Sequence, residues 1–214
     1  MPTPTIILNA RDQQPDPAAF ARIGSVLDRG GILVYPTETF YALGAAADAD
    51  AGIEKIFRLK ERDRGKPLSV VVADLGSAKS CAERLPGAFE RLACEFWPGP
   101  LTLIVKARAG FPPALLGPGG TIAVRVPGSL WLRDLLARFG RPVTATSANI
   151  SGEAEISRGV DAVRLFEGKV DLIVDGGDTP GGLPSTIVDL TRVPPLVVRA
   201  GAVPARSLAP FLVH

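Results

Sequence analysis

Hydrophobic positions along the chain switch between two periodicities, and the switching predicts interleaved helices and strands. Residues 16–29 carry apolar side chains at helical spacing behind Pro17, which predicts an amphipathic helix that ends at a glycine pair. The apolar run 32–35 that follows is typical of a buried strand. This strand delivers the polar segment 36–39 at its carboxyl end, the position where α/β sheets bind ligands.

The same periodicities continue to the end of the chain. Further helices are predicted over 51–62, within 78–96, and over 130–139 and 160–166. Further strands are predicted over 68–73, 101–106, 121–126, 142–146, 170–175, 187–190 and 196–199. Because strands and helices alternate without an internal repeat, we expect an α/β fold with a single domain over residues 1–214.

Two connecting features bear on function. Strand 121–126 alternates cleanly, so Arg125 is expected to point away from the core that Ile122 and Val124 face. The segment 175–184 is rich in glycine and proline, and we expect either a loop that closes over a ligand or a plain surface connection.

Two short polar motifs, Lys60-Glu61-Arg62 and Ser147-Ala148-Asn149, predict a shared site. Each places two hydrogen-bonding side chains at i and i+2, a spacing that points both the same way in extended backbone. The first motif supplies fixed positive charge and the second supplies neutral donors and acceptors. This mixture suits a ligand that carries phosphate and polar attachments.

Charge and residue usage exclude several classes of function. The chain has 24 basic and 22 acidic residues, so its net charge of +2 provides no global field for nucleic acid. The single histidine is His214, which disfavours histidine-dependent catalysis and histidine metal ligation. Cys81 and Cys94 lack metal-site spacing and are expected to be buried thiols, so no protein metal site is predicted. Without a signal peptide or a long apolar run, we expect a cytoplasmic protein with no membrane partner.

The two commonest nucleotide-binding signatures, GxxxxGK[ST] and GxGxxG, are absent. The chain nevertheless resembles a known family, the YrdC/TsaC-like threonylcarbamoyl-AMP synthases. Seven motifs carry the resemblance in order along the whole chain. They lie at 35–44, 60–68, 97–102, 121–127, 147–152, 185–189 and 199–201. Because the chain ends soon after the last motif, it resembles the single-domain members.

The resemblance implies an enzyme that condenses L-threonine, bicarbonate and ATP into threonylcarbamoyl-AMP and releases pyrophosphate. It implies a twisted, mixed α/β sheet with helices packed on it and a large concave, positively charged face. Mg²⁺ is expected with ATP, held mainly by phosphate oxygens and water. The implied partners are proteins that complete a tRNA modification, and weak RNA binding is possible on the same face.

The resemblance also assigns residues by position. The catalytic set implied comprises Lys60, Arg62, Ser147 and Asn149. The implied ATP contacts are Arg62, Lys66, Thr121, Asn149, Ser157 and Arg199. The implied threonine contacts are Thr39, Arg125, Ser147 and Ser185, of which Arg125 suits a carboxylate because its fork can pair both oxygens.

Structural alternatives stay open for each of these residues. Lys60 and Arg62 could form a solvated helix end, and Ser147 with Asn149 could form a turn and helix cap. Arg125 could be a surface charge, and the remaining hydroxyls could satisfy local backbone groups or cap a helix at Ser157.

Alternatives of function stay open as well. The chain departs from the family pattern at Ala42, Asp63 and Val71. These departures keep a paralogue that acts on a different carbamate among the alternatives. An RNA-binding module without adenylate chemistry is the other.

Overall fold

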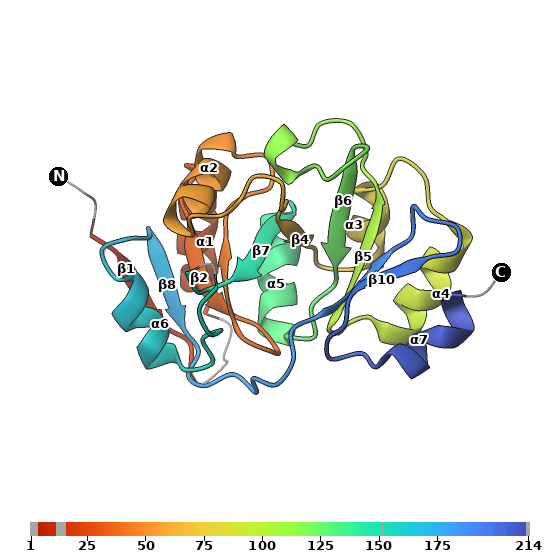
Figure 1. Cartoon of the computed structure of the whole chain (residues 1–214). Coiled ribbons are helices and arrows are strands. Elements are labelled where there is room, and N and C mark those ends of the chain that lie inside the picture. The colour runs from red at the N-terminus through yellow and green to blue at the C-terminus, as the bar shows by residue number, and fades with distance from the viewer. Residues whose placement is uncertain (1–3, 12–15, 151, 213–214) are drawn as a thin grey trace.

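The structure is a computed structural model that describes residues 4–11, 16–150 and 152–212, and it is organised around one long mixed sheet (Figure 1). The strands are β1 (Ile6–Asn9), β2 (Leu33–Pro36), β3 (Tyr41–Gly44), β4 (Ser69–Val71), β5 (Leu101–Lys106), β6 (Thr121–Arg125), β7 (Val143–Ser147), β8 (Leu172–Asp175), β9 (Thr186–Asp189) and β10 (Leu196–Arg199). They form a ten-stranded sheet in the order β1-β8-β2-β3-β7-β4-β6-β5-β9-β10. Parallel and antiparallel neighbours both occur, which confirms the expected mixed α/β sheet.

The helices are α1 (Pro17–Asp28), α2 (Asp50–Leu59), α3 (Leu75–Ser80), α4 (Gly87–Phe96), α5 (Leu130–Phe139), α6 (Gly159–Phe166) and α7 (Ala205–Leu212), with a short 3₁₀ turn at Pro113–Leu115. Local chemistry sets their ends. Asp16 caps α1 by accepting from the Ala18 backbone N–H at 2.9 Å, and α5 ends at Gly140 in the left-handed region. In the described part of the chain, no helix combines the length and apolar character that a membrane crossing needs.

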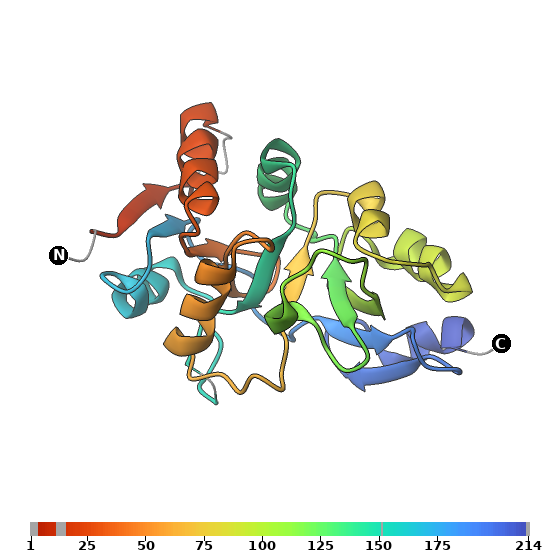
Figure 2. The same cartoon turned by 90° about the horizontal axis from the view of Figure 1, so that it is seen from above.

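The core has two layers, one on each face of the sheet. Figure 2 shows α1 and α5 on one side of the strands and α2 on the other. Successive residues of β2 divide accordingly, because Leu33 and Tyr35 pack with α1 and α5 whereas Val34 packs with α2. Both faces of the central strands are therefore buried, as expected for apolar runs between helices.

The predicted helices and strands are all present, with ends shifted by a few residues. The predictions missed β1, β3 and α7. Arg125 lies on the face of β6 opposite Ile122 and Val124, as expected, but it is buried there, with a relative exposure of 9%. One other expectation was wrong in part. Cys81 is buried as expected, but Cys94 is exposed.

Strand pairing brings the two functional regions together. β7 lies between β3 and β4, with Ser147 opposite Ala42 and Ala145 opposite Ser69. The chain after β7 therefore emerges beside the β2–β3 hairpin. Helix α2 follows β3 and leads into the segment that precedes β4, so Lys60 reaches the same place from the other side. This junction is the candidate site.

Candidate functional site

Lys60 holds the segment that follows β7. It caps the C-terminus of α2 and is almost fully buried, with 1% relative exposure. Its Nζ donates to the Ser147 carbonyl at 2.5 Å, to the Asn149 carbonyl at 2.6 Å and to Asn149 Oδ1 at 3.0 Å. An ammonium has three protons, so these contacts occupy all of them. Lys60 thus faces Ser147 and Asn149 rather than open space.

The two motifs meet as predicted, but the first motif is not in the extended backbone that its i, i+2 spacing predicted. Lys60 is in helical backbone, and Glu61 has a positive φ of 49°, so the first motif is a helix end with a left-handed turn rather than an extended segment. In the second motif, Ser147 Oγ donates to Asn149 Oδ1 at 2.7 Å. Asn149 Nδ2 donates to the Glu153 carbonyl at 2.6 Å, which fixes the orientation of the amide.

The electrostatics of Lys60 reflect its burial. Desolvation, followed by repulsion from Arg62, lowers the pKa of Lys60 to about 8, while the charge of Glu155 opposes the shift. The lysine therefore lies close to its titration range at neutral pH and responds to charge brought near it.

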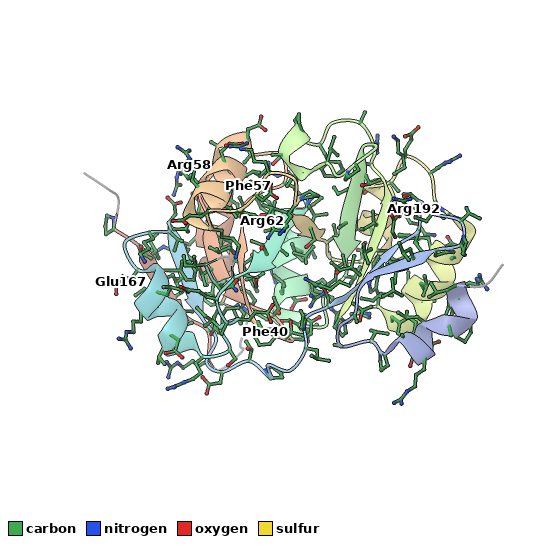
Figure 3. All side chains as sticks on the ribbon, in the orientation of Figure 1. Phe40, Phe57, Arg58, Arg62, Glu167 and Arg192 are labelled. Atoms are coloured by element: carbon green, nitrogen blue, oxygen red, sulfur yellow. The ribbon has the colours of Figure 1, made fainter. Side chains whose placement is uncertain are left out.

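Arg62 and Arg199 form the cationic part of the site. Figure 3 shows Arg62 near the middle of the molecule, while Arg58 lies at its outer edge. Arg62 Nε donates to the Lys66 carbonyl at 2.7 Å. Desolvation and then repulsion from Arg199 lower the pKa of Arg62. Two guanidinium groups are thus held near each other, an arrangement that a bound anion would stabilise.

Arg199 is positioned by Ser185. Its Nη2 donates to the Ser185 carbonyl at 2.7 Å and to Ser185 Oγ at 3.0 Å. The buried Ser185 hydroxyl also shares a 2.9 Å hydrogen bond with Thr102. Desolvation lowers the pKa of Arg199, and Arg125 adds repulsion against an opposing effect of Glu155. Arg199, the last residue of β10, is therefore close enough to Arg125, the last residue of β6, for their charges to repel each other.

Arg125 forms an ion pair with Glu38, the residue between Thr37 and Thr39 on the β2–β3 hairpin. Arg125 Nη2 donates to Glu38 Oε1, and the two side chains are only 10% and 19% exposed. The interpretation of Arg125 as a surface strand charge is therefore wrong. Its guanidinium does bind a carboxylate, but in this structure the carboxylate belongs to the chain itself.

A loop ties together two more of the predicted residues. Gly181 N–H donates to the Thr39 carbonyl at 2.8 Å, and Thr179 N–H donates to the Ser157 carbonyl at 2.7 Å. The Thr39 hydroxyl shares a 3.1 Å hydrogen bond with that of Thr37. The segment 175–184 thus contacts the site through its backbone.

Two predicted residues have no such link. Lys66 is exposed and contacts Arg62 only through its carbonyl. Thr121 begins β6, and its carbonyl accepts from the Gly117 N–H at 2.8 Å without contact to the other site residues among those described. Their roles as ATP contacts stay predictions.

Several structural alternatives are wrong. Lys60 is not a solvated helix end, because it is buried. Asn149 caps no helix, since the next helix is α6, and Arg158 rather than Ser157 is the N-cap of α6. His214, on which the argument against histidine catalysis rests, lies outside the described residues.

Sequence reasoning missed two acidic residues of the site, Glu38 and Glu155. Glu38 lies inside the polar segment 36–39, and that position was the only signal for it. The charge of Glu155 acts on both Lys60 and Arg199, where it partly opposes the lowering of their pKa by burial. Among the described residues, no three His, Cys, Asp or Glu side chains gather as a metal-binding group.

The sequence matches known proteins over most of its length. A model of the Sua5/YciO/YrdC family, described as telomere recombination, matches residues 25–201. Threonylcarbamoyl-AMP synthase from Pyrococcus abyssi (strain GE5 / Orsay) is 35% identical over 204 residues, which are 95% of this chain and 60% of that relative. The chain therefore spans less than two thirds of the length of this relative.

Solved structures agree with the family match. The crystal structure of P. abyssi Sua5 complexed with L-threonine is similar with a TM-score of 0.91 and 34% identity, over 97% of this chain and 61% of that one. The crystal structure of E. coli YciO is similar with a TM-score of 0.85 and 29% identity, over 99% of this chain and 100% of that one. With a family model covering residues 25–201 and this fold, the chain belongs to the Sua5/YciO/YrdC family.

Proposed function

We propose that the chain is a nucleotidyltransferase that condenses L-threonine, bicarbonate and ATP into threonylcarbamoyl-AMP and releases pyrophosphate. The observation that carries the proposal is a cluster of three cations: Arg62 is repelled by Arg199 and in turn repels Lys60, whose ammonium group donates to the segment after β7. Two mutually repelling guanidinium groups next to the neutral donors of Ser147 and Asn149 suit a polyphosphate joined to a polar group. The names of the similar proteins support the same activity.

The proposal divides the site into two ends. Phosphate and nucleotide contacts come from Arg62, Lys66, Thr121, Asn149, Ser157 and Arg199. Threonine and carbamate contacts come from Thr39, Arg125, Ser147 and Ser185. Lys60 acts through the residues that it positions, because its three donors are already used.

The chemistry is a displacement at phosphorus. A carbamate oxygen attacks the α-phosphorus, forming an O–P bond, and the bond to the β-phosphate oxygen breaks as pyrophosphate leaves. Both reactants are anions, so catalysis consists of bringing them together and stabilising charge on the leaving group. Arginine, lysine and hydroxyl groups supply this without a histidine.

Mg²⁺ is part of the proposal as a companion of ATP. The acidic residues whose charges act on Arg62 and Arg199 are Asp63 and Glu155, and among the described residues no three His, Cys, Asp or Glu side chains gather into an oxygen cage for the ion. The ion would be bound by phosphate oxygens and water, where it would neutralise charge on the leaving pyrophosphate. The proposal also includes the next step, in which partner proteins use threonylcarbamoyl-AMP to modify tRNA.

The test is pyrophosphate release from ATP by the purified chain. Release is expected to require threonine and bicarbonate together. Arg62→Ala is expected to reduce the rate by at least tenfold, because charge-assisted hydrogen bonds contribute about 1.5–3 kcal/mol each. Arg58→Ala is the matched control, since Arg58 is exposed on the preceding helix and carries the same charge. Release that continues without threonine or without bicarbonate would contradict the proposal.

A further inference from the structure

The ion pair between Glu38 and Arg125 is incomplete. Both side chains are largely buried, and the pair has one hydrogen bond, from Arg125 Nη2 to Glu38 Oε1. Among the described residues, Glu38 Oε2 and Arg125 Nε are buried without any hydrogen-bond partner. One acceptor and one donor are thus left unpaired in the same contact.

This arrangement differs from a stable guanidinium–carboxylate pair. Such pairs gain most from two parallel hydrogen bonds, and the atoms left over here are one donor and one acceptor of the kind that a second bond would join. The surface pair between Arg64 and Glu54 has that second bond, with contacts of 2.7 and 2.5 Å. Leaving buried polar atoms unpaired is unfavourable. The ion pair with Glu38 is therefore weaker than a pair in which the guanidinium donates two parallel hydrogen bonds.

We propose that Glu38 is a specificity-determining residue that occupies Arg125 in place of the carboxylate of the amino-acid ligand. The inference rests on the proposed function, which places that carboxylate at Arg125. A ligand carboxylate that takes both Nε and Nη2 satisfies the orphaned donor and replaces Glu38. A ligand without a carboxylate cannot compete with the internal one. Access to the amino-acid end is therefore conditional on a free carboxylate.

The hairpin permits this exchange without moving the sheet. Thr37 Oγ1 donates to the Phe40 carbonyl at 2.7 Å and accepts from the Thr39 N–H at 3.2 Å, which fixes the backbone on both sides of Glu38. The Glu38 side chain is 19% exposed, so rotation about its own bonds can bring the carboxylate to solvent. Gly128 packs closely against the same side chain, because a Cβ on Gly128 would lie 3.1 Å from Glu38 Cγ. The lack of a side chain at Gly128 therefore leaves the space that Glu38 occupies.

The neighbouring charges favour a return of the pair when the ligand leaves. Arg125 lies close enough to Arg199 to lower the pKa of Arg199, so an unpaired Arg125 would add to the repulsion in the site. Glu38 removes this cost in the free protein. It does so with a single hydrogen bond, which a better ligand can displace.

Calorimetric titration of L-threonine into the chain, without ATP or bicarbonate, tests the inference. Glu38→Gln keeps the shape but has a neutral side chain, whose hydrogen bond to Arg125 is weaker. We expect it to bind L-threonine about tenfold more tightly than the wild type, equivalent to about 1.4 kcal/mol. Glu54→Gln, which removes a carboxylate from the exposed pair with Arg64, is the matched control and should leave the affinity unchanged.

Three results would overturn the inference: unchanged affinity in Glu38→Gln, weaker affinity in Glu38→Gln, or no threonine binding by either protein. In an Arg125→Gln background, Glu38→Gln should have no effect, and an equal gain there would also overturn it. If Glu38→Gln does not fold, Glu38→Asp retains the charge with a shorter reach and should give a smaller gain. Failure of pyrophosphate release alongside the expected binding pattern would reject the proposed function and leave the role of Glu38 intact.

Discussion

Lys60 donates hydrogen bonds to both the backbone carbonyl and the side-chain oxygen of Asn149, at 2.6 and 3.0 Å, across 89 positions of sequence. The third proton is donated to the Ser147 carbonyl. A buried charge is costly unless its donors are all satisfied, and here a single segment satisfies them. The lysine therefore fixes the orientation of both polar residues that follow β7, one for each proposed end of the site.

Replacing Lys60 should affect stability and binding together. In Lys60→Met, three oxygens lose the lysine donor, and the Asn149 carbonyl loses it without another donor among the described residues, so the free energy of unfolding is expected to fall by about 1–3 kcal/mol in denaturant titrations. ATP and threonine affinities should both decrease, because Asn149 and Ser147 lose their common support. Lys55→Met, an exposed change on the same helix, should remain within about 0.5 kcal/mol of the wild type. Loss of ATP affinity alone, with unchanged stability, would indicate a direct phosphate contact instead.

The titration of Lys60 predicts a dependence on pH. Its pKa is lowered from 10.5 to about 8, so between these values the unfolded chain binds more protons than the folded one. The penalty for burying the charge is fully present below pH 8, and the contribution of Lys60 to stability becomes more favourable as pH rises towards 10.5. ATP affinity should change in the opposite sense, because deprotonation removes a positive charge from the site.

NMR of ¹³Cε-labelled lysine should show one resonance with a midpoint near pH 8 that disappears in Lys60→Met. ATP should move this midpoint upwards, since an anion favours the charged form. A lysine resonance that titrates near 10.5 in the free protein would contradict the burial on which the prediction depends.

The sequence predicted most of the fold because apolar periodicity determines burial directly. It missed β3 (Tyr41–Gly44), a four-residue strand that directly follows the polar segment 36–39 and lies within the motif 35–44. The backbone conformation between Lys60 and Arg62 could not be predicted from their spacing. Helix α2 extends to Leu59, and Glu61 then adopts a left-handed conformation instead of an extended one. The alternation in β6 placed Arg125 on the correct face, but that face is covered by the hairpin that carries Glu38. Such contacts depend on tertiary packing, which local patterns do not contain.

In addition to its proposed contact with threonine, Ser185 should influence ATP binding through Arg199. In Ser185→Ala, the guanidinium loses the 3.0 Å contact with the hydroxyl but keeps the one with the backbone carbonyl. We expect ATP affinity to fall by about fivefold, the effect of losing one hydrogen bond of about 1 kcal/mol. Thr102→Val removes the other partner of the same hydroxyl and leaves the Arg199 contact, so ATP binding should change less. Equal losses in the two variants would mean that the Thr102–Ser185 bond, rather than the Arg199 contact, controls binding.

Added salt should stabilise the free protein but weaken its binding of ATP, and both effects should depend on Arg62 and Arg199. In the free protein they repel each other, and the repulsion is screened over about 8 Å at 0.15 M ionic strength. Adding salt should therefore relieve a destabilising term in the free chain while weakening its attraction for ATP. Each single change to glutamine should weaken ATP binding by about tenfold or more, because each removes a charge-assisted contact.

The two substitutions should not be additive for stability. Removing either arginine relieves the same repulsion, which can be relieved only once, so the double variant should be less stable than the sum of the single effects predicts, with a coupling of about 0.5–3 kcal/mol. Denaturant titrations of the four proteins at low and high salt measure this coupling, which should shrink as salt is added. Additive effects at every salt concentration would show that the two guanidinium groups are too far apart to share one anion.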